Sequence, residues 1–514
     1  MKDTVSLVGA YYSGKSVLVT GATGFMGKVL IEKFLRSCHD VKTIYVCVRP
    51  KGGCSMQTRV ENLLKCKVFD RVREEWPNFH EKIKPISAEF TKPNLAISSE
   101  DMEELLSEVN VIFHCAATVR FDEPLNRDAL LLNVMGTQQL LGLAHQMKNL
   151  QALIHVSTAF SNCNRRHIEE VIYPVPVEPK KLLELVAWMD GSLIEAITPN
   201  LIGDWPNTYT FSKALTEHLI QQEKGDLNVA IVRPSIMGAS WQEPFPGWID
   251  NFNNISGSFI GKGILQTVKC DPAFVADIIP VDLAINLTIA AGWYIAVHRW
   301  ESLLIFNCTS GSFNPLCWGE IGIHVKNSFE KNPLEKPFRI PNITMTSSYL
   351  THQYWTFVHH TIPAFLCDLY LQLIGKKPWM MKLFTRLEKV MSLLEYFISH
   401  SWDWNSENTN MLMKELNPKD KNLFSFDVCQ VTWSEYIKNY CLGTKKYLLN
   451  EDMAGIPAAQ QLKTIHCALK ATLFVIIWRI FIARSKVAQN LWYFLLNLCY
   501  KFFSYARASS TLRN

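Results

Sequence analysis

Residues 15–27, KSVLVTGATGFMG, decide the fold of this chain. Ser16–Val19 is a short β-branched run, which is typical of a strand that is buried on both faces. Thr20–Gly27 contains three glycines, and the apolar positions of Val29–Leu35 then follow helical spacing. A strand, a glycine-rich turn and a helix in this order predict a phosphate cradle. Glycine lets the backbone approach a pyrophosphate closely, and the helix N-terminus presents free N–H groups.

The alternative interpretation of this stretch is an ordinary glycine-rich turn of an α/β protein. A glycine pattern alone is weak evidence, but the strand before it and the helix after it favour dinucleotide binding.

The end of the next strand bears on the choice of dinucleotide. The strand predicted over Thr43–Val48 is followed by Arg49 and Pro50. An acidic residue here would accept hydrogen bonds from the ribose 2′-OH of NAD, whereas a guanidinium matches a 2′-phosphate. Arg49 as a solvated loop charge is the alternative. The sequence therefore favours NADPH.

Composition narrows the class of protein. The 514 residues are 48% hydrophobic and 19% charged, which predicts two or three domains with ample core and argues against long disorder. The net charge of +5, without a basic stripe or zinc spacing, gives no reason to expect a nucleic-acid partner or a metal site. The 14 cysteines are scattered, which is typical of reduced thiols in a cytosol-facing protein.

Strands and helices alternate along the first half of the chain. The predicted fold class is therefore α/β, a doubly wound parallel-sheet Rossmann domain. We predict a long helix over Phe121–His145 that carries Asn133. Further strands are predicted at Ile83–Ile86, Val109–His114, Leu153–Val156 and Val229–Val232.

Four hydroxyl or amine side chains form a candidate catalytic set. Ser157 and Thr158 end a predicted strand, where ligands of open α/β sheets bind. Tyr209 and Lys213 lie one turn apart on a predicted helix and share a face. Tyr209 can donate a proton to an alkoxide, Lys213 can lower the phenol's pKa, and one of the hydroxyls can bind the carbonyl oxygen. Such a Tyr–Lys pair is common on structural helices, so its weight comes from the motifs upstream.

These motifs resemble a known family. TGATGFMG, HVSTAF and YTFSK in this order resemble the extended short-chain dehydrogenase/reductase superfamily. The stretches VCVRP, FHCAATVRFDE, VEPKK, WPNTYTFSKAL, IVRPSIMGASWQEPFPGW and DMAGIP are similar to animal alcohol-forming fatty acyl-CoA reductases of the peroxisomal type. The similarity runs from near Tyr11 to the end of the chain.

The resemblance implies a reaction and a set of roles. Long-chain acyl-CoA would be reduced by NADPH to an aldehyde and then to a primary alcohol, in two successive hydride transfers that supply wax or ether-lipid synthesis. The superfamily's catalytic hydroxyl falls on Thr158, with Tyr209 and Lys213 as its partners. Phe160 stands where this family is expected to have tyrosine. A covalent thioester on Cys115 or Cys163 is the competing mechanism, although neither has an obvious base partner in sequence.

The cofactor site is predicted to extend beyond the glycine turn. It includes small residues after the fourth strand, which let a cofactor lie against the backbone. The residues assigned to it are Thr20, Gly21, Thr23, Gly24, Phe25, Met26, Gly27, Arg49, Glu89, Ala116, Ala117, Asn133, Tyr209, Lys213 and Pro234. Residues 241–250, rich in proline and aromatic side chains, are predicted to form a loop that covers the substrate rather than a core segment.

The predicted organisation has three parts: residues 1–345 as the reductase domain, 353–450 as a small helical domain that resembles the family's C-terminal domain, and 464–505 as a membrane-associating tail. His359 and His360 are expected to be packed or exposed on a helix. In the tail, the apolar patches 471–482 and 492–503 fit a membrane span or an embedded hairpin, and a buried helical pair is the alternative. The resemblance implies the peroxisomal membrane, with the catalytic part facing the cytosol. The sequence leaves the oligomeric state open.

Two other functions remain open from the residues. A sterol or sugar-nucleotide dehydrogenase would share the fold and the catalytic set, but Arg49 and the residues of 241–250 disfavour it. A membrane-anchored NADP-binding scaffold would fit the Phe160 departure, but the complete set of Thr158, Tyr209 and Lys213 argues against it.

Overall fold

The structure is a computed structural model, and it describes residues 5–50, 53–122, 125–251, 265–335 and 343–451, with scattered positions between 472 and 497. The chain divides into two compact units. One contains residues 1–331 and 337–451, and the other contains residues 332–336 and 452–514. The first unit carries every element discussed below.

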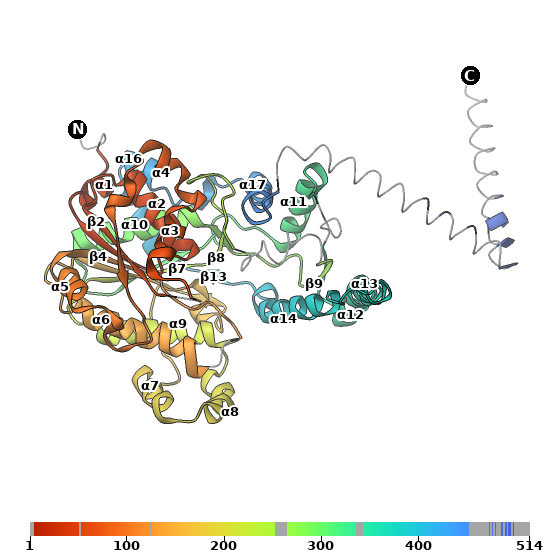
Figure 1. The fold of residues 1–514 in the computed structure, drawn as a ribbon, viewed down its shortest axis with the longest axis horizontal. Coiled ribbons are helices and arrows are strands. Elements are labelled where there is room, and N and C mark those ends of the chain that lie inside the picture. Colours follow the sequence, from red (N-terminus) through yellow and green to blue (C-terminus); the bar gives the residue numbers. More distant parts are fainter. Residues whose placement is uncertain are drawn as a thin grey trace, which may run out of the picture. The chain divides into compact units, whose positions relative to one another are not determined.

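A seven-stranded sheet forms the centre of this unit (Figure 1). Its order is β11-β7-β5-β4-β1-β2-β3, and every neighbouring pair is parallel. The strands are β1 (Ser16–Thr20), β2 (Thr43–Val48), β3 (Ile83–Ser87), β4 (Val109–His114), β5 (Ala152–Val156), β7 (Val229–Pro234) and β11 (Leu304–Cys308). The predicted doubly wound α/β fold is confirmed, and β11 extends it by a strand that the sequence did not reveal.

The strand order reverses beside β1. The chain runs outward from β1 through β2 to β3, and then returns to place β4 on the other side of β1. The carboxyl ends of β1 and β4 therefore form the topological switch point, where open α/β sheets bind their ligands.

Helices cover both faces of the sheet. Figure 1 shows α2 and α10 on one face and α6 and α9 on the other. These helices are α2 (Phe25–Ser37), α6 (Gly136–Ala144), α9 (Thr208–Glu223) and α10 (Val281–His298). Within the described residues, only α10 is long and apolar enough to cross a membrane, with a mean hydropathy of 1.3, but 83% of it is buried in the fold. We therefore interpret α10 as a core helix.

The other elements are shorter or lie at the edges. The helices before the C-terminal part are α1 (Leu7–Tyr12), α3 (Met56–Leu64), α4 (Asp70–Glu75), α5 (Ser99–Glu108), α7 (Pro179–Trp188), α8 (Gly191–Ile202) and α11 (Trp318–Lys331). The short strands pair as β6 (His167–Ile168) with β13 (Asp403–Trp404), β8 (Ile236–Gly238) with β10 (Ile278–Pro280), and β9 (Thr267–Lys269) with β12 (Thr344–Thr346).

The helix predicted over residues 121–145 differs from the structure. A π-helix, η4 (Leu125–Met135), precedes α6, and residues 121 and 122 lie before it in a turn. In η4, the Asn133 side chain bonds the backbone of Thr118 in both directions, at 2.9 and 3.3 Å. This contact holds the loop after β4 against the helix, an arrangement that hydrophobic spacing does not encode.

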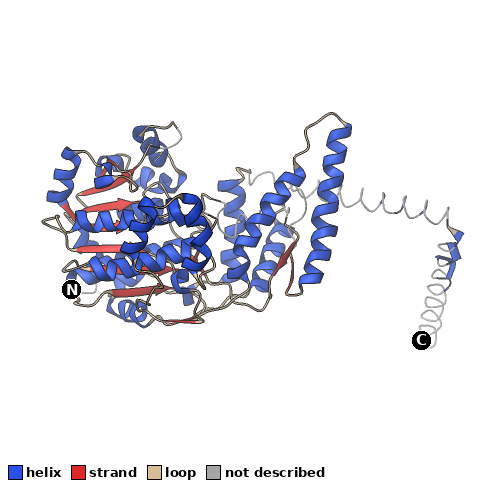
Figure 2. Ribbon diagram, turned by 90° about the horizontal axis from the view of Figure 1, so that it is seen from below, coloured by secondary structure: helices blue, strands red, loops and turns tan. Residues whose placement is uncertain are grey.

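The C-terminal part is helical, as predicted (Figure 2). It contains α12 (Tyr349–Thr356), η7 (Phe357–Thr361), α13 (Ile362–Leu373), α14 (Met380–Ile398), α15 (Glu407–Glu415), α16 (Pro418–Leu423) and α17 (Trp433–Gly443). These helices belong to the same compact unit as the sheet, so the division near residue 345 stays a prediction. The predicted tail at 464–505 lies outside the described residues, apart from scattered positions.

Candidate active site

The glycine-rich turn brings two strand ends into close contact at the switch point. Gly21 has a φ of +70°, and a Cβ there would lie 2.8 Å from the backbone nitrogen of Ala116, which follows β4. A Cβ on Gly27 would lie 2.3 Å from the Gly21 carbonyl oxygen, so only glycine lets α2 pack against the turn. Gly24 is the exposed N-cap of α2, and a Cβ there would lie 3.1 Å from the Gly21 carbonyl oxygen. The turn therefore has the shape that a pyrophosphate requires.

Thr20 shapes the cradle from inside. Its buried hydroxyl accepts a hydrogen bond from the backbone of Ala116 at 3.1 Å and contacts Nδ1 of His114 at 2.8 Å. Burial and the nearby Lys213 charge lower the pKa of His114 to about 3, so its ring is neutral. Thr20 thus fixes the loop that contains Ala116 and Ala117, both of which are half-buried.

Two arginines lie near the end of β2: Arg49, which follows the strand, and Arg59, which belongs to α3 (Met56–Leu64). Arg49 forms an ion pair of 3.4 Å with Glu89, and both side chains are partly exposed. Arg59, from α3, donates hydrogen bonds to the backbone oxygen of Arg49 and to Thr23 Oγ1, the latter at 2.8 Å. Burial and the neighbouring Arg49 charge lower the pKa of Arg59. Two guanidinium groups therefore meet beside the glycine turn.

Sequence reasoning identified Arg49 and missed Arg59. Arg59 follows Arg49 on the next helix, and nothing in its spacing names a partner. Thr23, which the sequence assigned to the cofactor site, accepts a hydrogen bond from Arg59 and so orients the Arg59 guanidinium.

Tyr209 lies at the start of α9. The side chain of Asn207 caps this helix by accepting from the Thr210 N–H at 2.9 Å. The Tyr209 ring packs against Phe121, with centroids 5.6 Å apart. Burial raises the pKa of Tyr209 to about 12, although a hydrogen bond with Thr158 lowers it in part. The phenol is thus a protonated group in contact with the Thr158 hydroxyl.

Lys213 lies one turn further along α9. It is only 3% exposed, and its ammonium donates to the Val156 carbonyl at 2.8 Å, at the end of β5. Burial lowers the pKa of Lys213 to about 8, while the carboxylate of Glu217 opposes this shift. The structure therefore brings Thr158, Tyr209 and Lys213 together, as the sequence predicted.

Ser157 faces a different partner from Thr158. Its hydroxyl donates to Glu217 at 2.5 Å. The same carboxylate receives Nε and Nη2 of Arg233 at 2.9 and 2.6 Å, and this ion pair is almost fully buried. Ser157 thus belongs to a buried network behind the site, and the geometry favours Thr158 as the hydroxyl that meets a carbonyl oxygen. Glu217 and Arg233 are supporting residues that sequence reasoning missed, although Arg233 begins the RPS stretch after the sixth predicted strand.

The remaining predicted cofactor residues surround the same edge. Asn133 donates to the hydroxyl of Ser212 at 2.9 Å as well as to Thr118, so its amide positions the loop after β4 and helix α9. Pro234 is buried at the end of β7, and its carbonyl accepts from Thr158 at 3.5 Å. Met26 is buried in α2, and Phe25 is half-buried beside the turn.

The aromatic cluster around Phe160 links the site to the C-terminal helices. Phe160 packs edge-on against Phe397, Trp402 and Trp404, with centroids 5.2 to 5.7 Å apart. These neighbours form an apolar environment in which phenylalanine fits without a hydroxyl partner.

Neither cysteine near the motifs has the character of a nucleophile. Burial raises the pKa of Cys115 and of Cys163 to about 12. Because the thiolate is the reactive form, both side chains are inert thiols at neutral pH.

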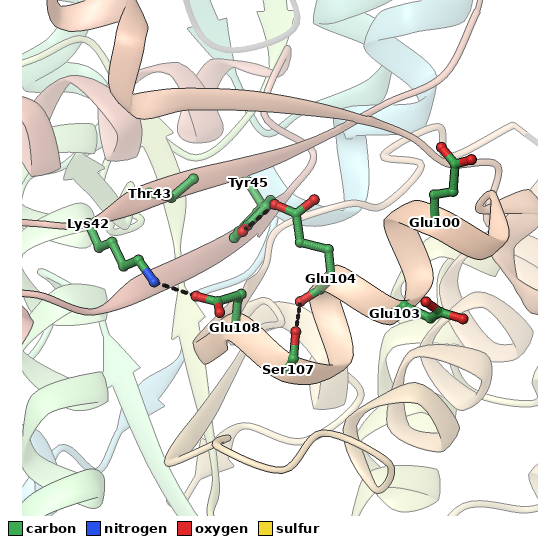
Figure 3. A pocket seen from close by; sticks show the side chains of 8 residues that line it. All are labelled: Lys42, Thr43, Tyr45, Glu100, Glu103, Glu104, Ser107 and Glu108. Carbon is green, nitrogen blue, oxygen red and sulfur yellow. Dashed lines mark hydrogen bonds and ion pairs between the residues drawn. The ribbon is translucent and has the colours of Figure 1, made fainter.

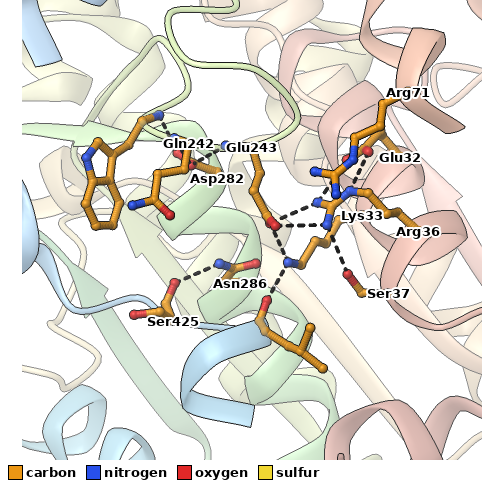
Figure 4. A network of polar contacts seen from close by, with 12 residues as sticks. Glu32, Lys33, Arg36, Ser37, Arg71, Gln242, Glu243, Asp282, Asn286 and Ser425 are labelled. Atoms are coloured by element: carbon orange, nitrogen blue, oxygen red, sulfur yellow. Dashed lines mark hydrogen bonds and ion pairs between the residues drawn. The ribbon is translucent and has the colours of Figure 1, made fainter. Parts of the chain in front are cut away.

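Residues 241–250 were predicted to cover the substrate and not to belong to the core. The second part of this prediction is wrong. Trp248 is buried and stacks on Phe25, with centroids 5.4 Å apart. Figure 4 shows Glu243 paired with Lys33 and Arg36 of α2, at 2.5 and 2.8 Å, and Asp282 of α10 beside Gln242 and Glu243. The Asp282 carboxylate accepts from three successive backbone N–H groups of the loop. These contacts satisfy the loop's backbone inside the fold, so proline and aromatic content did not mean exposure.

His359 and His360 are packed, one of the two options expected. The His360 side chain is buried and accepts from the Gln266 N–H at 2.9 Å, and His359 stacks on Trp355.

A shallow hollow between β2 and α5 is unrelated to this site. Figure 3 shows that it is lined by Lys42, Thr43, Tyr45 and carboxylates of α5. Thr43 begins β2, so the hollow lies at the amino end of the strands, opposite to the glycine turn.

Comparisons with known proteins agree with this geometry. An NAD-binding family model described as male sterility protein matches residues 19–288, and a second model with the same description matches residues 359–451. The cofactor is therefore a nicotinamide dinucleotide. Among solved structures, a reductase domain of a non-ribosomal peptide synthetase from Mycobacterium tuberculosis has a TM-score of 0.58 at 17% identity, covering 86% of this chain and 95% of that one. The terminal R domain of the myxalamid pathway has a TM-score of 0.54 at 18% identity, covering 84% and 90%. These two share the fold.

Relatives with closer sequences extend along the whole chain. Fatty acyl-CoA reductase 1 of Homo sapiens is 58% identical over 98% of this chain and 99% of its own length. Fatty acyl-CoA reductase 1 of Gallus gallus is 57% identical with the same coverage. Fatty acyl-CoA reductase 2 of Bos taurus is 57% identical over 99% of this chain and all of its own. With a matching family model over residues 19–288 and the Thr158–Tyr209–Lys213 set in place, this chain is an oxidoreductase that belongs to the fatty acyl-CoA reductase family.

Proposed function

We propose that this protein reduces long-chain fatty acyl-CoA to a primary alcohol and CoA with NADPH, in two successive reductions at one site. The names of the relatives support the substrate class, and the single set of Thr158, Tyr209 and Lys213 at one sheet edge supports a single site. The observation that carries the proposal is the protonated Tyr209 phenol, which is hydrogen-bonded with Thr158 and lies one helical turn from the buried Lys213 at the carboxyl edge of the sheet.

The residues present fit a nicotinamide cofactor. The glycine turn would hold the pyrophosphate, and Ala116 and Ala117 leave room for the cofactor against the backbone. When bound, the nicotinamide supplies the hydride in both reductions. Arg49 and Arg59 support NADPH over NADH, since two adjacent guanidinium groups match a dianionic phosphate better than a hydroxyl.

The catalytic side chains would act in the same way in each reduction. Thr158 would donate a hydrogen bond to the carbonyl oxygen and stabilise the charge that develops on it. Tyr209 would then give its proton to that oxygen, while the Lys213 ammonium stabilises the phenolate that remains. In the first reduction the thioester becomes a hemithioacetal, which releases the CoA thiol and leaves an aldehyde. The second reduction converts the aldehyde into the alcohol.

The raised thiol pKa values support this route over a covalent one. A covalent thioester would need a thiolate near the carbonyl, and both Cys115 and Cys163 are held protonated by burial. The scaffold alternative gains no support from the site, since the catalytic set is complete. The aromatic C-terminal part that packs beside the site argues against the sterol and sugar-nucleotide alternatives.

The proposal is tested by stoichiometry. Full-length protein is incubated with NADPH or NADH and a panel of acyl-CoAs that differ in chain length and unsaturation. Cofactor oxidation, free CoA and lipid products are then followed together. We expect two NADPH molecules oxidised for each alcohol and each CoA released, with little aldehyde accumulating. One NADPH for each aldehyde, without alcohol, would overturn the double reduction.

Membrane association is a separate part of the proposal. The apolar pattern of residues 464–505 supports an anchor, and the resemblance supports the peroxisomal membrane, with the catalytic part in the cytosol and its alcohols passing to ether-lipid or wax synthesis. Removal of the chain after Leu462 should release the protein from membranes. Full-length protein that already stays in the supernatant of low-salt extracts would contradict the anchor, and protease protection of the catalytic part in intact organelles would contradict its orientation.

A further inference from the structure

Helix α13 exposes a continuous apolar stripe. Its large exposed side chains recur at helical spacing, so they share one face. They are Ile362, Phe365, Leu366, Leu369, Tyr370, Leu373 and, just after the helix, Ile374. Phe365 is 59% exposed and Leu373 is 78% exposed. Monomeric soluble proteins rarely leave such a patch uncovered, so it marks an interaction surface.

The opposite face of α13 is already occupied. Ala364 packs with Met380 and Phe384 of α14, and Cys367 lies against the same cluster. Asp368, only 8% exposed, accepts from the backbone N–H groups of Trp379, Met380 and Met381 at 2.8 to 2.9 Å and so caps α14. α13 therefore packs against α14 through its other face, and the exposed stripe is not needed for that packing.

The exposed charges around the stripe are mostly positive. Between residues 349 and 389 the acidic residues are Asp368, which is buried in the cap just described, and the exposed Glu388. The lysines and arginines are Lys376, Lys377, Lys382, Arg386 and Lys389, and all are exposed. Tyr370 and Trp379, also exposed, lie at the end of the stripe beside the lysines. Apolar side chains bordered by aromatic and cationic ones are typical of a helix that lies in a membrane interface.

We propose that the outer face of α13 docks the catalytic body onto an anionic lipid surface, with its helix parallel to the membrane. A span is excluded by length, since the 12 residues of α13 reach only about 18 Å and a bilayer core is about 30 Å thick. A second copy of this chain is a poorer occupant, because two surfaces whose exposed charges are mostly positive repel each other, whereas anionic headgroups attract them. The proposal rests on residues 349–387 and not on the tail, so it concerns a second contact with the membrane.

The docking surface has a consequence for the substrate. α14 connects α13 to the aromatic cluster near the site, through contacts of Phe397 with Phe121 and Phe160. A lipid-docked α13 would hold the site at a fixed height above the membrane, from which long-chain acyl-CoA is drawn.

Photocrosslinking in the full chain identifies the occupant directly. Phe365 is replaced by the photoreactive analogue p-benzoylphenylalanine, and the matched control carries the analogue at Trp188, a 74% exposed aromatic position on α7. Both proteins are reconstituted into vesicles of phosphatidylcholine and phosphatidylserine and irradiated, and lipid adducts are measured by mass spectrometry. We expect severalfold more lipid adduct at position 365 than at position 188. Unchanged NADPH oxidation by both variants reports intact folding.

Each other product would overturn the proposal. A crosslinked dimer would assign the stripe to a second copy, and an internal crosslink to residues 452–514 would assign it to the chain's own tail. Equal lipid adducts at both positions would mean that the tail alone holds the protein at the vesicle. A Lys376→Glu, Lys377→Glu double variant adds a charge test: it should reduce the adduct at position 365 on anionic vesicles and not on pure phosphatidylcholine, and equal yields would contradict electrostatic docking.

Discussion

The two ends of the nucleotide site are built in opposite ways. At the catalytic end, Lys213 is 3% exposed, and Glu217 and Arg233 form a buried ion pair. At the other end, the Arg49–Glu89 pair is 38% and 26% exposed and 3.4 Å long. Burial shifts the pKa of Tyr209 and Lys213, whereas the Arg49 guanidinium is partly exposed beside the glycine turn. We therefore expect substitutions at the buried catalytic end to reduce turnover or stability strongly. Substitutions of Arg49 or Arg59 at the other end should reduce only the affinity for NADPH.

The largest effect is expected from Tyr209→Phe. This substitution keeps the ring on Phe121 and removes the proton donor, so turnover should fall by ~100-fold or more, the usual scale for a positioned acid. Binding of NADPH, measured by fluorescence titration, should stay nearly unchanged. Acyl-CoA and added long-chain aldehyde should be affected alike. A variant that reduces aldehyde at the normal rate but fails on acyl-CoA would show that the two reductions use different acids.

Glu217→Ala should cost more stability than any comparable change at an exposed pair. It leaves the buried Arg233 without its carboxylate, which costs about 3–5 kcal/mol. The matched control is Glu108→Ala, since Glu108 pairs with Lys42 at the surface and its loss should cost at most ~1 kcal/mol. Urea denaturation of both variants measures the difference. Equal losses would mean that burial does not separate the two classes of ion pair.

The phosphate end should lose affinity for one cofactor only. Arg49→Ala and Arg59→Ala should each raise the KM for NADPH by roughly 10- to 100-fold, the usual value of a charge-assisted hydrogen bond, and leave the KM for NADH nearly unchanged. Arg49→Asp should weaken NADPH further through repulsion. If Arg59→Ala raised the KM for NADPH and for NADH equally, Arg59 would stabilise the glycine turn through Thr23 rather than bind the 2′-phosphate.

The pH profile should report the buried lysine. Lys213 has a pKa of about 8 and must be protonated to stabilise the phenolate, so log kcat/KM should fall by about one unit per pH unit above that value. Because the Glu217 carboxylate raises the pKa of Lys213, Glu217→Gln should move this limb to lower pH. A limb that stays in place in the variant would separate Lys213 from the observed titration.

The smallest effect is expected from Ser157→Ala. The Ser157 hydroxyl serves Glu217 rather than the substrate, so its loss should cost about 1 kcal/mol of stability and little turnover. Thr158→Ala is the matched comparison and should reduce kcat far more. Steady-state kinetics of the pair decides between them, and a reversed order would assign the carbonyl contact to Ser157.

Features that depend on a few neighbouring residues could be predicted from the sequence. The glycine turn follows from local backbone geometry, six of the seven strands of the sheet from runs of apolar residues, and the shared face of Tyr209 and Lys213 from helix periodicity. The strand that was missed, β11, has no local sequence motif that predicts it. The position of the glycine turn and of Tyr209 and Lys213 at the carboxyl edge of the sheet was predicted from the rule that open parallel sheets bind ligands there.

The tertiary structure decided what depends on residues far apart. Ser157 and Thr158 are neighbouring hydroxyl residues, and their contacts separate them: Ser157 donates to Glu217 of α9, whereas Thr158 is hydrogen-bonded with Tyr209. Arg59 became a candidate because α3 folds back onto Arg49. In the loop at 241–250, residues 247–249 are buried, and Asp282 accepts from the N–H groups of residues 241–243. The apolar face of α13 looks like ordinary core spacing until α14 is seen to occupy the other side. Periodicity states that a face is apolar, but burial and hydrogen-bond partners are set by whichever distant segment reaches that face.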